Sequence, residues 1–207
     1  HHMQQTFIRN IEDNRDYPDL EFVLLDYNSS DGLSDWVKSE LSGEIAAGRL
    51  NYYWTSQPTY FHPTHARNMS IRLARGDIVC VVDADNFTGR GFASYIADNV
   101  QPDTFLVGCR MIGDRFEPLW DEGCVGRFAI YKSTFLDVGG MDEEHVGWGY
   151  DDLDLYERLR AKGYRCQSID PRYTKCIAHD DSERRKELRE QHIGRDSTTG
   201  EGSVWVN

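Results

Sequence analysis

The feature that most constrains the fold of this 207-residue chain is the regular alternation of short apolar runs with helical stretches. The apolar runs are rich in β-branched and aromatic residues and end at turn-forming residues, which is typical of strands. The stretches between them carry apolar residues at helical spacing and end at helix-stop signals. The predicted strands cover residues 21–26, 50–54, 77–82 and 104–108, and the predicted helices cover residues 35–47, 64–74 and 91–99.

This order of elements predicts an α/β fold with a mostly parallel sheet flanked by helices. Ligands of such sheets bind at the carboxyl ends of the strands, near the point at which the strand order reverses. Two predicted strands end in acidic residues at this edge: Asp26 follows the first strand, and Asp83 and Asp85 follow the third. We therefore expect the functional site at these strand ends.

The charge and the cysteines of the chain exclude several classes of protein. There are 23 basic and 35 acidic residues, a net charge of −12, whereas a nucleic-acid-binding protein needs a basic surface. No apolar stretch is long enough to cross a bilayer, and the start carries no secretory pattern. The five cysteines include no C-x-x-C pair, so we expect neither a zinc cluster nor a disulfide framework. We expect a cytoplasmic protein, with peripheral contact at the inner face of a membrane as the alternative.

Asp83 and Asp85 form a D-x-D pair directly after a buried strand. Residues two apart in an extended segment project to the same side, so the two carboxylates converge and repel each other unless a cation lies between them. A hard divalent ion such as Mg²⁺ or Mn²⁺ prefers such oxygen ligands. The alternative is that both acids cap the turn before residues 87–89, but the position after an apolar strand favours a metal site.

A second constellation covers residues 147–154, where glycines flank Trp148 and acids then open a helix. Acids at a helix start suit the positive end of the helix dipole, which is the simpler interpretation of Asp151 and Asp152. A tryptophan beside carboxylates also suits a sugar, because the ring covers C–H groups while the acids accept hydroxyls. One of the two acids is then a candidate general base.

The third candidate is His179, which follows a short β-like stretch over residues 173–178 and precedes a charged helix over residues 182–191. A lone histidine is more often structural than a ligand. This late position nevertheless allows the segment to fold back over the site and lend an imidazole to a metal.

Together these residues resemble the nucleotide-sugar glycosyltransferases of the GT-A fold, and in particular the family-2-like members. The resemblance spans about residues 4–190 and depends on the order and spacing of several blocks. The second half also resembles the β-1,4-galactosyltransferase group, in which a G-W-G-x-E-D segment holds acceptor-binding and catalytic acids and a late M-x-x-H supplies metal ligands. The matching blocks are residues 25–31, 66–68, 74–77, 83–85, 138–143, 147–149 and His179.

The resemblance implies one GT-A, Rossmann-like domain over residues 1–207. Residues 4–108 would form the nucleotide-binding half, residues 109–190 the acceptor and metal half, and residues 191–207 a tail. The first strand of the family, whose end grips the nucleotide, is missing upstream of the first helix, so the fold is expected without its N-terminal strand.

The resemblance also implies residues for the nucleotide of the donor. Asp26 would contact the uracil or the ribose, Arg67 and Asn68 would approach the nucleotide, and Asp83 would lie near the ribose. Tyr27 departs from the family here, because family-2 members often carry a second aspartate in its place.

For the metal, the resemblance implies that Asp85 is the stronger ligand of Mn²⁺ or Mg²⁺, with Asp83 and His179 as further ligands. Cys176 stands at the methionine of the M-x-x-H motif. The ion would bridge the diphosphate of the donor and take up the charge that builds on the leaving UDP.

On the acceptor side, Trp148 would contact sugar and diphosphate, Asp151 would bind the acceptor, and Asp152 would be the general base. Leu153 stands where the galactosyltransferases carry another acid. The sequence thus predicts an inverting hexosyltransferase of polysaccharide biosynthesis, which moves a sugar from a UDP-sugar to a hydroxyl of a glycan or lipid-linked glycan.

Two other functions stay open at the level of the sequence. A nucleotidyltransferase also holds Mg²⁺ with strand-end carboxylates, although it normally needs a Gly-rich loop with Lys or Arg for the triphosphate. A non-catalytic module that binds nucleotide or carbohydrate would keep Trp148 and Asp26 but would not need a metal and a base together.

Overall fold

The computed structural model describes residues 2–57, 61–112, 115–117, 124–146, 149–177 and 204–205. The chain divides into two compact units. The first unit comprises His1–Asp19, Asp77–Gly140 and Asp152–Asp180, and the second comprises Leu20–Gly76, Met141–Asp151 and Asp181–Asn207.

The first unit is built on a four-stranded sheet with the strand order β10–β5–β8–β3. Strand β10 (Arg165–Ser168) runs parallel to β5 (Thr104–Val107), and β8 (Phe128–Tyr131) is antiparallel to both β5 and β3 (Ile78–Val81). The α/β fold is confirmed, but this sheet is mixed rather than mostly parallel. The reason lies in the connection before β8, which contains the antiparallel ribbon of β6 (Arg110–Ile112) and β7 (Arg115–Glu117) instead of a crossover helix.

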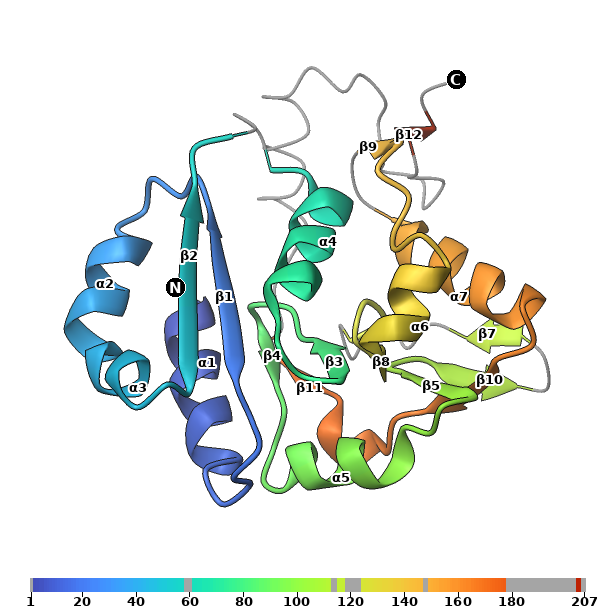
Figure 1. Ribbon diagram of the computed structural model, residues 1–207, viewed down its shortest axis with the longest axis horizontal. Coiled ribbons are helices and arrows are strands. Elements are labelled where there is room, and N and C mark those ends of the chain that lie inside the picture. The colour runs from blue at the N-terminus through green and yellow to red at the C-terminus, as the bar shows by residue number, and fades with distance from the viewer. Residues whose placement is uncertain are drawn as a thin grey trace. The chain divides into compact units, whose positions relative to one another are not determined.

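Helices cover both faces of this sheet. Helix α5 (Phe92–Asn99) lies on one face, and α6 (Lys132–Asp137) and α7 (Asp151–Ala161) lie on the other (Figure 1). The alternation of side chains along β5 explains the two layers: Leu106 belongs to the cluster with α5, whereas Phe105 contacts Tyr156 of α7 at 5.9 Å between ring centroids.

Two leucines anchor α7 in the core. Leu155 and Leu159 are both fully buried, because residues four apart lie on the same helix face. An ion pair flanks these leucines on α7, with 2.8 Å between Asp154 Oδ2 and Arg158 Nη2.

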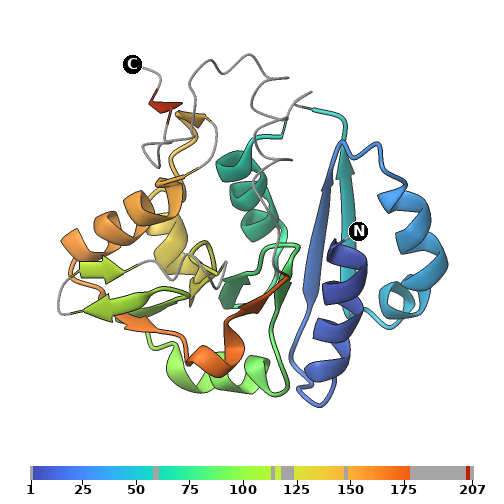
Figure 2. The ribbon, with the colours of Figure 1, turned by 180° about the vertical axis from the view of Figure 1, so that it is seen from behind.

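The second unit is built on the parallel pair β1 (Phe22–Tyr27) and β2 (Leu50–Thr55). Helix α4 (Pro63–Leu73) lies on one side of this pair, and α2 (Leu33–Glu40) and α3 (Ser42–Ala46) lie on the other (Figures 1 and 2).

The single helix predicted over residues 35–47 is wrong, because the structure has two helices separated at Leu41. The backbone of Leu41 leaves the helical region at φ −115°, and its side chain is buried. Ser42 and Gly43 follow, and both have lower helix propensity than alanine. After the break Ile45 no longer faces the core and is 39% exposed.

The remaining elements lie outside the four-stranded sheet and the β1–β2 pair. Helix α1 (His2–Asp13) and strands β4 (Asn86–Phe87) and β11 (Lys175–Cys176) belong to the first unit, as does the 3₁₀ turn η2 (Pro171–Tyr173). Strand β9 (His145–Val146) pairs with β12 (Val204–Trp205) in the second unit. The predicted β-like stretch over residues 173–178 is therefore a 3₁₀ turn followed by a two-residue strand, and the predicted helix over residues 182–191 lies outside the described residues.

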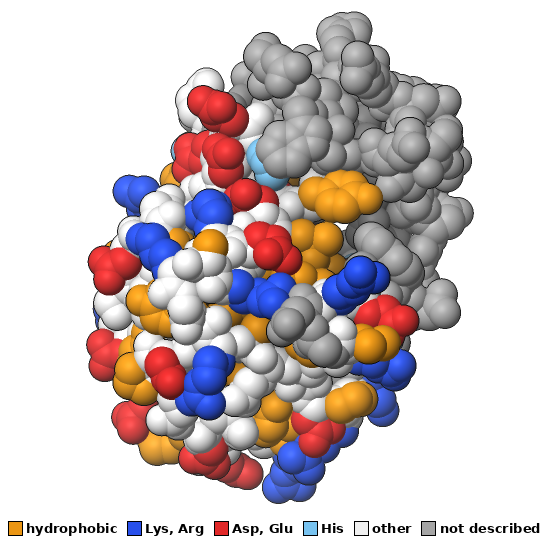
Figure 3. All heavy atoms as spheres, turned by 90° about the vertical axis from the view of Figure 1, so that its right-hand side faces the viewer, with side chains coloured by type: hydrophobic (Ala, Val, Ile, Leu, Met, Phe, Trp, Pro, Cys, Tyr) orange, Lys and Arg blue, Asp and Glu red, His pale blue; other side chains and the backbone are white. Residues whose placement is uncertain are grey.

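Acidic side chains occur across the face of the molecule that Figure 3 shows, and Lys and Arg side chains are interspersed among them. None of the helices in the described part of the chain is both long enough and apolar enough to span a bilayer.

Candidate active site

The D-x-D loop follows β3 in the first unit. Its turn is closed by a hydrogen bond from the Asn86 N–H to the Asp83 carbonyl at 3.0 Å, and Asn86 Nδ2 donates to Asp85 Oδ1 at 2.8 Å. Asp83 and Asp85 are both partly exposed. The loop therefore presents two carboxylates near solvent, while its backbone is held in a defined turn.

Helix α1 secures this loop with a row of buried polar side chains. Thr6, Asn10 and Asn14 are spaced by four residues, so they share one helix face, and each is at most 5% exposed. Thr6 Oγ1 donates to the Ala84 carbonyl at 2.6 Å, between the two aspartates. Asn10 Nδ2 donates to the Asn86 carbonyl at 2.9 Å.

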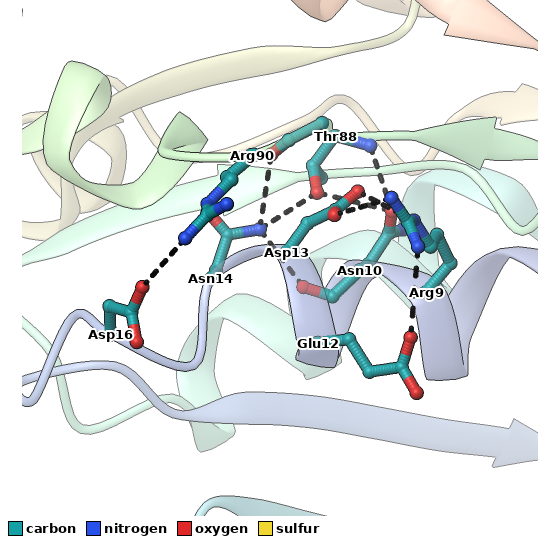
Figure 4. Close-up of polar contacts among 9 residues, drawn as sticks. Arg9, Asn10, Glu12, Asp13, Asn14, Asp16, Thr88 and Arg90 are labelled. Atoms are coloured by element: carbon teal, nitrogen blue, oxygen red, sulfur yellow. Dashed lines mark hydrogen bonds and ion pairs between the residues drawn. The ribbon is translucent and has the colours of Figure 1, made fainter.

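The same row continues beyond the loop, as Figure 4 shows. Asn10 Oδ1 accepts from the Thr88 N–H at 2.8 Å, and Asn14 Nδ2 donates to Thr88 Oγ1 at 2.9 Å. Asn14 Oδ1 accepts from the Ala93 N–H at the start of α5 at 2.8 Å. Sequence reasoning missed these anchors, although polar residues at a spacing of four on a helix with apolar neighbours were a usable signal.

The strand β11 borders the loop from another part of the chain. It pairs antiparallel with β4, so that Cys176 lies opposite Asn86, and the Ile177 N–H donates to the Asp85 carbonyl at 2.8 Å. The fully buried Arg127 supports this pairing: its Nη2 donates to the Phe87 carbonyl at 3.1 Å, and its Nη1 donates to the Tyr173 carbonyl. Sequence reasoning also missed Arg127.

A buried thiol lies within electrostatic range of the two aspartates. Burial raises the pKa of Cys124 to about 12, and the nearby carboxylates of Asp83 and Asp85 add to the shift while Arg127 opposes it. Cys176 contributes in the same direction as the aspartates. Asp83, Asp85 and Cys176 thus all lie within electrostatic range of the Cys124 thiol, and a role of these residues as metal ligands stays a prediction.

A divalent cation fits the chemistry of this loop in part. The loop offers two oxygen donors, the type that Mn²⁺ and Mg²⁺ prefer. Within the part of the chain that the structure describes, no group of three or more His, Cys, Asp and Glu side chains is arranged to hold a metal ion. Further donors would come from a bound diphosphate and from residues such as His179, which lies outside the described residues.

Asp26 is the penultimate residue of β1 in the second unit and is 1% exposed. Its Oδ1 accepts from the Ser29 N–H at 2.9 Å, and its Oδ2 accepts from the Tyr52 hydroxyl at 2.6 Å. Two protein donors thus already occupy this carboxylate, and a contact with uracil or ribose stays a prediction.

The neighbouring Tyr27 points to α4. Its hydroxyl lies 2.8 Å from His65 Nδ1, and burial raises the pKa of Tyr27 to about 12, with the carboxylate of Glu143 adding to the shift. Where the family often has an acid, this chain therefore has a phenol that stays neutral.

Helix α4 uses its predicted donor-binding residues to hold the segment over residues 141–151. Asn68 Nδ2 donates to the Met141 carbonyl at 2.9 Å and to Glu143 Oε1 at 2.8 Å, and its Oδ1 accepts from the Met141 N–H at 2.9 Å. Arg67 Nη1 lies 2.7 Å from Asp151 Oδ2, and both side chains are largely buried. Contacts of Arg67 and Asn68 with a nucleotide stay predictions.

The two acids at the start of α7 have different surroundings. Asp151 forms the ion pair with Arg67, whereas Asp152 Oδ1 accepts from the N–H of Leu153 at 2.8 Å. Both are less than 10% exposed. Trp148, the third predicted residue of this segment, lies outside the described residues.

Two family models match the chain. One, described as glycosyl transferase family 2, matches residues 4–136, and the other, described as the N-terminal domain of galactosyltransferase, matches residues 116–180. Among curated proteins, human chondroitin sulfate synthase 3 is 41% identical over 46 residues, which are 22% of this chain. The chain matches only 5% of the length of that relative.

Solved structures of glycosyltransferases share the fold. The mannosyltransferase PcManGT from Pyrobaculum calidifontis, in complex with GDP-Man and Mn²⁺, has a TM-score of 0.65 at 19% identity and covers 94% of this chain and 61% of its own. GalNAc-T7 with UDP, GalNAc and Mn²⁺ has a TM-score of 0.60 at 15% identity and covers 81% of this chain and 39% of its own. At these identities the likeness is one of fold.

Proposed function

The chain belongs to glycosyl transferase family 2, as the resemblance predicted, and we propose that it is a metal-dependent, inverting transferase. It moves a sugar from a UDP-sugar to a hydroxyl of a glycan or of a lipid-linked glycan. The observation that carries this proposal is the D-x-D loop, whose backbone is fixed by α1 while both of its carboxylates stay partly exposed.

The ligands proposed for Mn²⁺ or Mg²⁺ are Asp85, with Asp83 in support, and His179. A bound divalent ion supplies positive charge that stabilises the departing diphosphate. The bond from the Ile177 N–H to the Asp85 carbonyl supports the third ligand, because two further residues span at most about 7 Å of extended chain. The solved relatives with GDP-Man and Mn²⁺, and with UDP and Mn²⁺, support a nucleotide and a divalent metal.

For the nucleotide we propose Asp26, Arg67 and Asn68, with Asp83 near the ribose. In the described structure these side chains make intramolecular contacts: Asn68 fixes the backbone of Met141, and Arg67 pairs with Asp151. These contacts fix the side chains in position before the donor binds, so a side chain that contacts the nucleotide needs no rearrangement.

For the chemical step we propose Asp152 as the general base. It accepts the proton of the acceptor hydroxyl while the hydroxyl oxygen bonds to the anomeric carbon and the bond from that carbon to the UDP oxygen breaks. Such base catalysis is worth roughly 10²–10⁴-fold. Asp151, oriented by Arg67, binds an acceptor hydroxyl, and Trp148 contacts the sugar and the diphosphate.

We further propose that the whole chain acts as one catalytic domain. Residues 4–108 bind the nucleotide, residues 109–190 supply metal ligands and acceptor groups, and residues 191–207 form a tail. In support, each compact unit combines segments from both of these halves.

The experiment that tests the base compares Asp152→Asn with Asp154→Asn, a matched variant in the same helix. Asp154 forms a partly exposed pair with Arg158, and such pairs contribute little, so this variant keeps its transfer rate. Asp152→Asn keeps the oxygen that accepts from Leu153 but loses transfer roughly 10²–10⁴-fold. Near-normal transfer by Asp152→Asn would show that the base is another group.

A screen of UDP-sugars and GDP-sugars for Mn²⁺-dependent hydrolysis and transfer tests the donor. The proposal expects hydrolysis of a UDP-sugar that stops when the metal is chelated. Nucleotide binding without metal and without turnover would instead support a non-catalytic binding module.

A further inference from the structure

An open pocket of about 510 Å³ lies in the first unit, beside the ribbon of β4 and β11. Among the described residues that line it, four are cationic and one is acidic, in a chain with a net charge of −12. Of the proposed donor and metal residues that the structure describes, Asp26, Arg67, Asn68, Asp83 and Asp85, none is among these lining residues. The lining residues are Arg9, Asp13, Phe87, Gly89, Arg90, Arg172 and Lys175.

Three separate segments build this basic pocket. Helix α1 provides Arg9, whose neighbours on the helix are shown in Figure 4, the turn after β4 provides Arg90, and η2 with β11 provides Arg172 and Lys175. Phe87 and Lys175 are partners across the β4–β11 ribbon, so their side chains lie on the same face. The pocket thus combines guanidinium groups, an ammonium group and an aromatic ring.

Gly89 lines the basic pocket at a backbone position that favours glycine. Its φ of +76° favours glycine, and a Cβ there would lie 3.5 Å from the ring of Tyr173. Tyr173 in turn carries the guanidinium of Arg172 at 4.7 Å from its ring centroid, so the cation is held at the wall of the pocket.

The arginines are available for an external anion. Arg9 pairs with Asp13 at 3.1 Å, Arg90 with Asp16 at 3.5 Å and Arg172 with Asp170 at 3.2 Å. The arginine side chains are 60%, 84% and 64% exposed, and exposed pairs of this kind contribute little to stability. An anion that offers better geometry can therefore take over these guanidinium groups.

Lys175 is the fourth cationic residue of the basic pocket. Among the residues that the structure describes, it has no ion pair, and it lies across the ribbon from Phe87. An ammonium group beside a partly exposed aromatic ring suits a sugar that carries a negative group, since the ring covers C–H groups while the cation binds the anion.

We propose that the basic pocket binds an anionic saccharide through its carboxylate or sulfate groups, and that this saccharide belongs to the acceptor; the second part rests on the function proposed above. The volume lies in the range of small-molecule sites. Arginine forks match the two oxygens of such groups. A membrane surface fits less well, because a protein with a net charge of −12 is repelled by an extended anionic bilayer.

The test measures binding of a hexasaccharide with alternating uronic acids, in the absence of nucleotide and metal. The variants are Arg172→Gln and Lys175→Gln in the pocket and Arg165→Gln outside it. Arg165 is a matched control in the same unit, because it is 63% exposed and pairs with Asp103 at 2.9 Å.

Each pocket variant weakens binding about tenfold, the value of one hydrogen bond to a charged group, whereas Arg165→Gln leaves binding unchanged. The carboxyl-reduced, neutral hexasaccharide does not bind. Equal binding of the neutral sugar, an equal loss with Arg165→Gln, or tighter binding to vesicles of anionic phospholipid would each overturn the proposal.

A second readout separates this proposal from the proposed function. In transfer assays the pocket variants raise the KM for the acidic acceptor and not the KM for its neutral counterpart. If the protein binds the acidic hexasaccharide but hydrolyses no nucleotide sugar, the function fails while the binding site stands. If it hydrolyses a UDP-sugar but does not bind the acidic hexasaccharide, the binding site fails alone.

Discussion

Both units carry aspartates at the carboxyl end of a strand, β1 in the second unit and β3 in the first, and the two strand ends are built differently. In the second unit Asp26 is buried, and its oxygens accept from the Ser29 N–H and the Tyr52 hydroxyl. In the first unit the loop of Asp83 and Asp85 is held largely at its backbone carbonyls, and both side chains stay partly exposed. Asp26 stabilises its own loop through both carboxylate oxygens, whereas Thr6 and Ile177 hold the backbone of the D-x-D loop from other segments.

The difference shows how one sequence signal leads to two outcomes. A buried carboxylate must be hydrogen-bonded, and Tyr52 on the neighbouring strand supplies a donor to Asp26. The D-x-D loop instead receives its donors from Thr6 and Asn10 on α1. The role of an aspartate at a strand end therefore depends on which other side chains stabilise the loop that carries it.

The largest effect on the transfer rate is expected for Asp85→Asn. Transfer at saturating Mn²⁺ falls roughly 10²–10³-fold, as when one charge-stabilising group is removed from an active site. The melting temperature stays close to that of the wild type, because the Ile177 N–H bonds to the backbone carbonyl of residue 85. A variant that keeps its transfer rate would break the comparison.

Asn10→Ala is expected to have the largest effect on stability. It removes the hydrogen bonds to the Asn86 carbonyl and from the Thr88 N–H inside a buried network, which costs about 2–4 kcal/mol of unfolding free energy. Urea unfolding measures this loss. In the control Asn99→Ala, which loses one bond to the Tyr95 carbonyl, the cost is about 1 kcal/mol; equal losses would mean that α1 does not secure the loop.

Asp26→Asn is expected to destabilise the protein by about 1–3 kcal/mol, because the buried Asp26 side chain would offer one acceptor oxygen to two donors. In the same experiment Asp85→Asn is expected to leave the free energy of unfolding nearly unchanged. The two variants therefore distinguish an aspartate with a structural role from one that is accessible to a ligand. An Asp26→Asn protein with wild-type stability would remove the contrast between the two strand ends.

The smallest expected effect is that of Tyr27 on the free energy of unfolding at alkaline pH. Because burial raises the pKa of Tyr27 to about 12 from 10.0, the folded protein binds more protons than the unfolded chain between these values. This contribution to stability is complete below pH 10 and is lost as the pH rises to about 12. Unfolding free energies at several pH values in this window should fall less steeply for Tyr27→Phe.

The buried thiols do not obscure this measurement. Burial also raises the pKa of Cys80, Cys109, Cys124 and Cys166 to about 12, but these groups are present in both proteins and their contributions cancel. Equal slopes for the wild type and Tyr27→Phe would contradict the burial of the phenol.

The local features of the fold could be predicted from the sequence. The strands before Asp26 and Asp83, the helix that Asp151 opens and the pair of Asp154 with Arg158 all follow from patterns within a few residues. Side-chain period and turn residues encode such features directly.

The features that organise the site could not be predicted in the same way. Asn10 and Asn86 are 76 residues apart, and Arg127 reaches backbone carbonyls 40 and 46 residues away. Periodic patterns in the sequence identify the buried face of a helix but not the segment against which that face packs. The mixed sheet arose from a hairpin before β8, and the break at Leu41 arose because burial of its side chain outweighed helix continuity.

The central claim is that the D-x-D loop binds a metal together with the diphosphate of UDP. The most direct test is a calorimetric titration of UDP into the wild type and into Asp85→Asn, each with and without Mn²⁺. We predict that Mn²⁺ tightens UDP binding by the wild type at least roughly tenfold, a usual size of coupling between two ligands, and has no effect on the variant. UDP binding by the wild type that does not depend on Mn²⁺, or an undiminished effect of Mn²⁺ on Asp85→Asn, would contradict the claim.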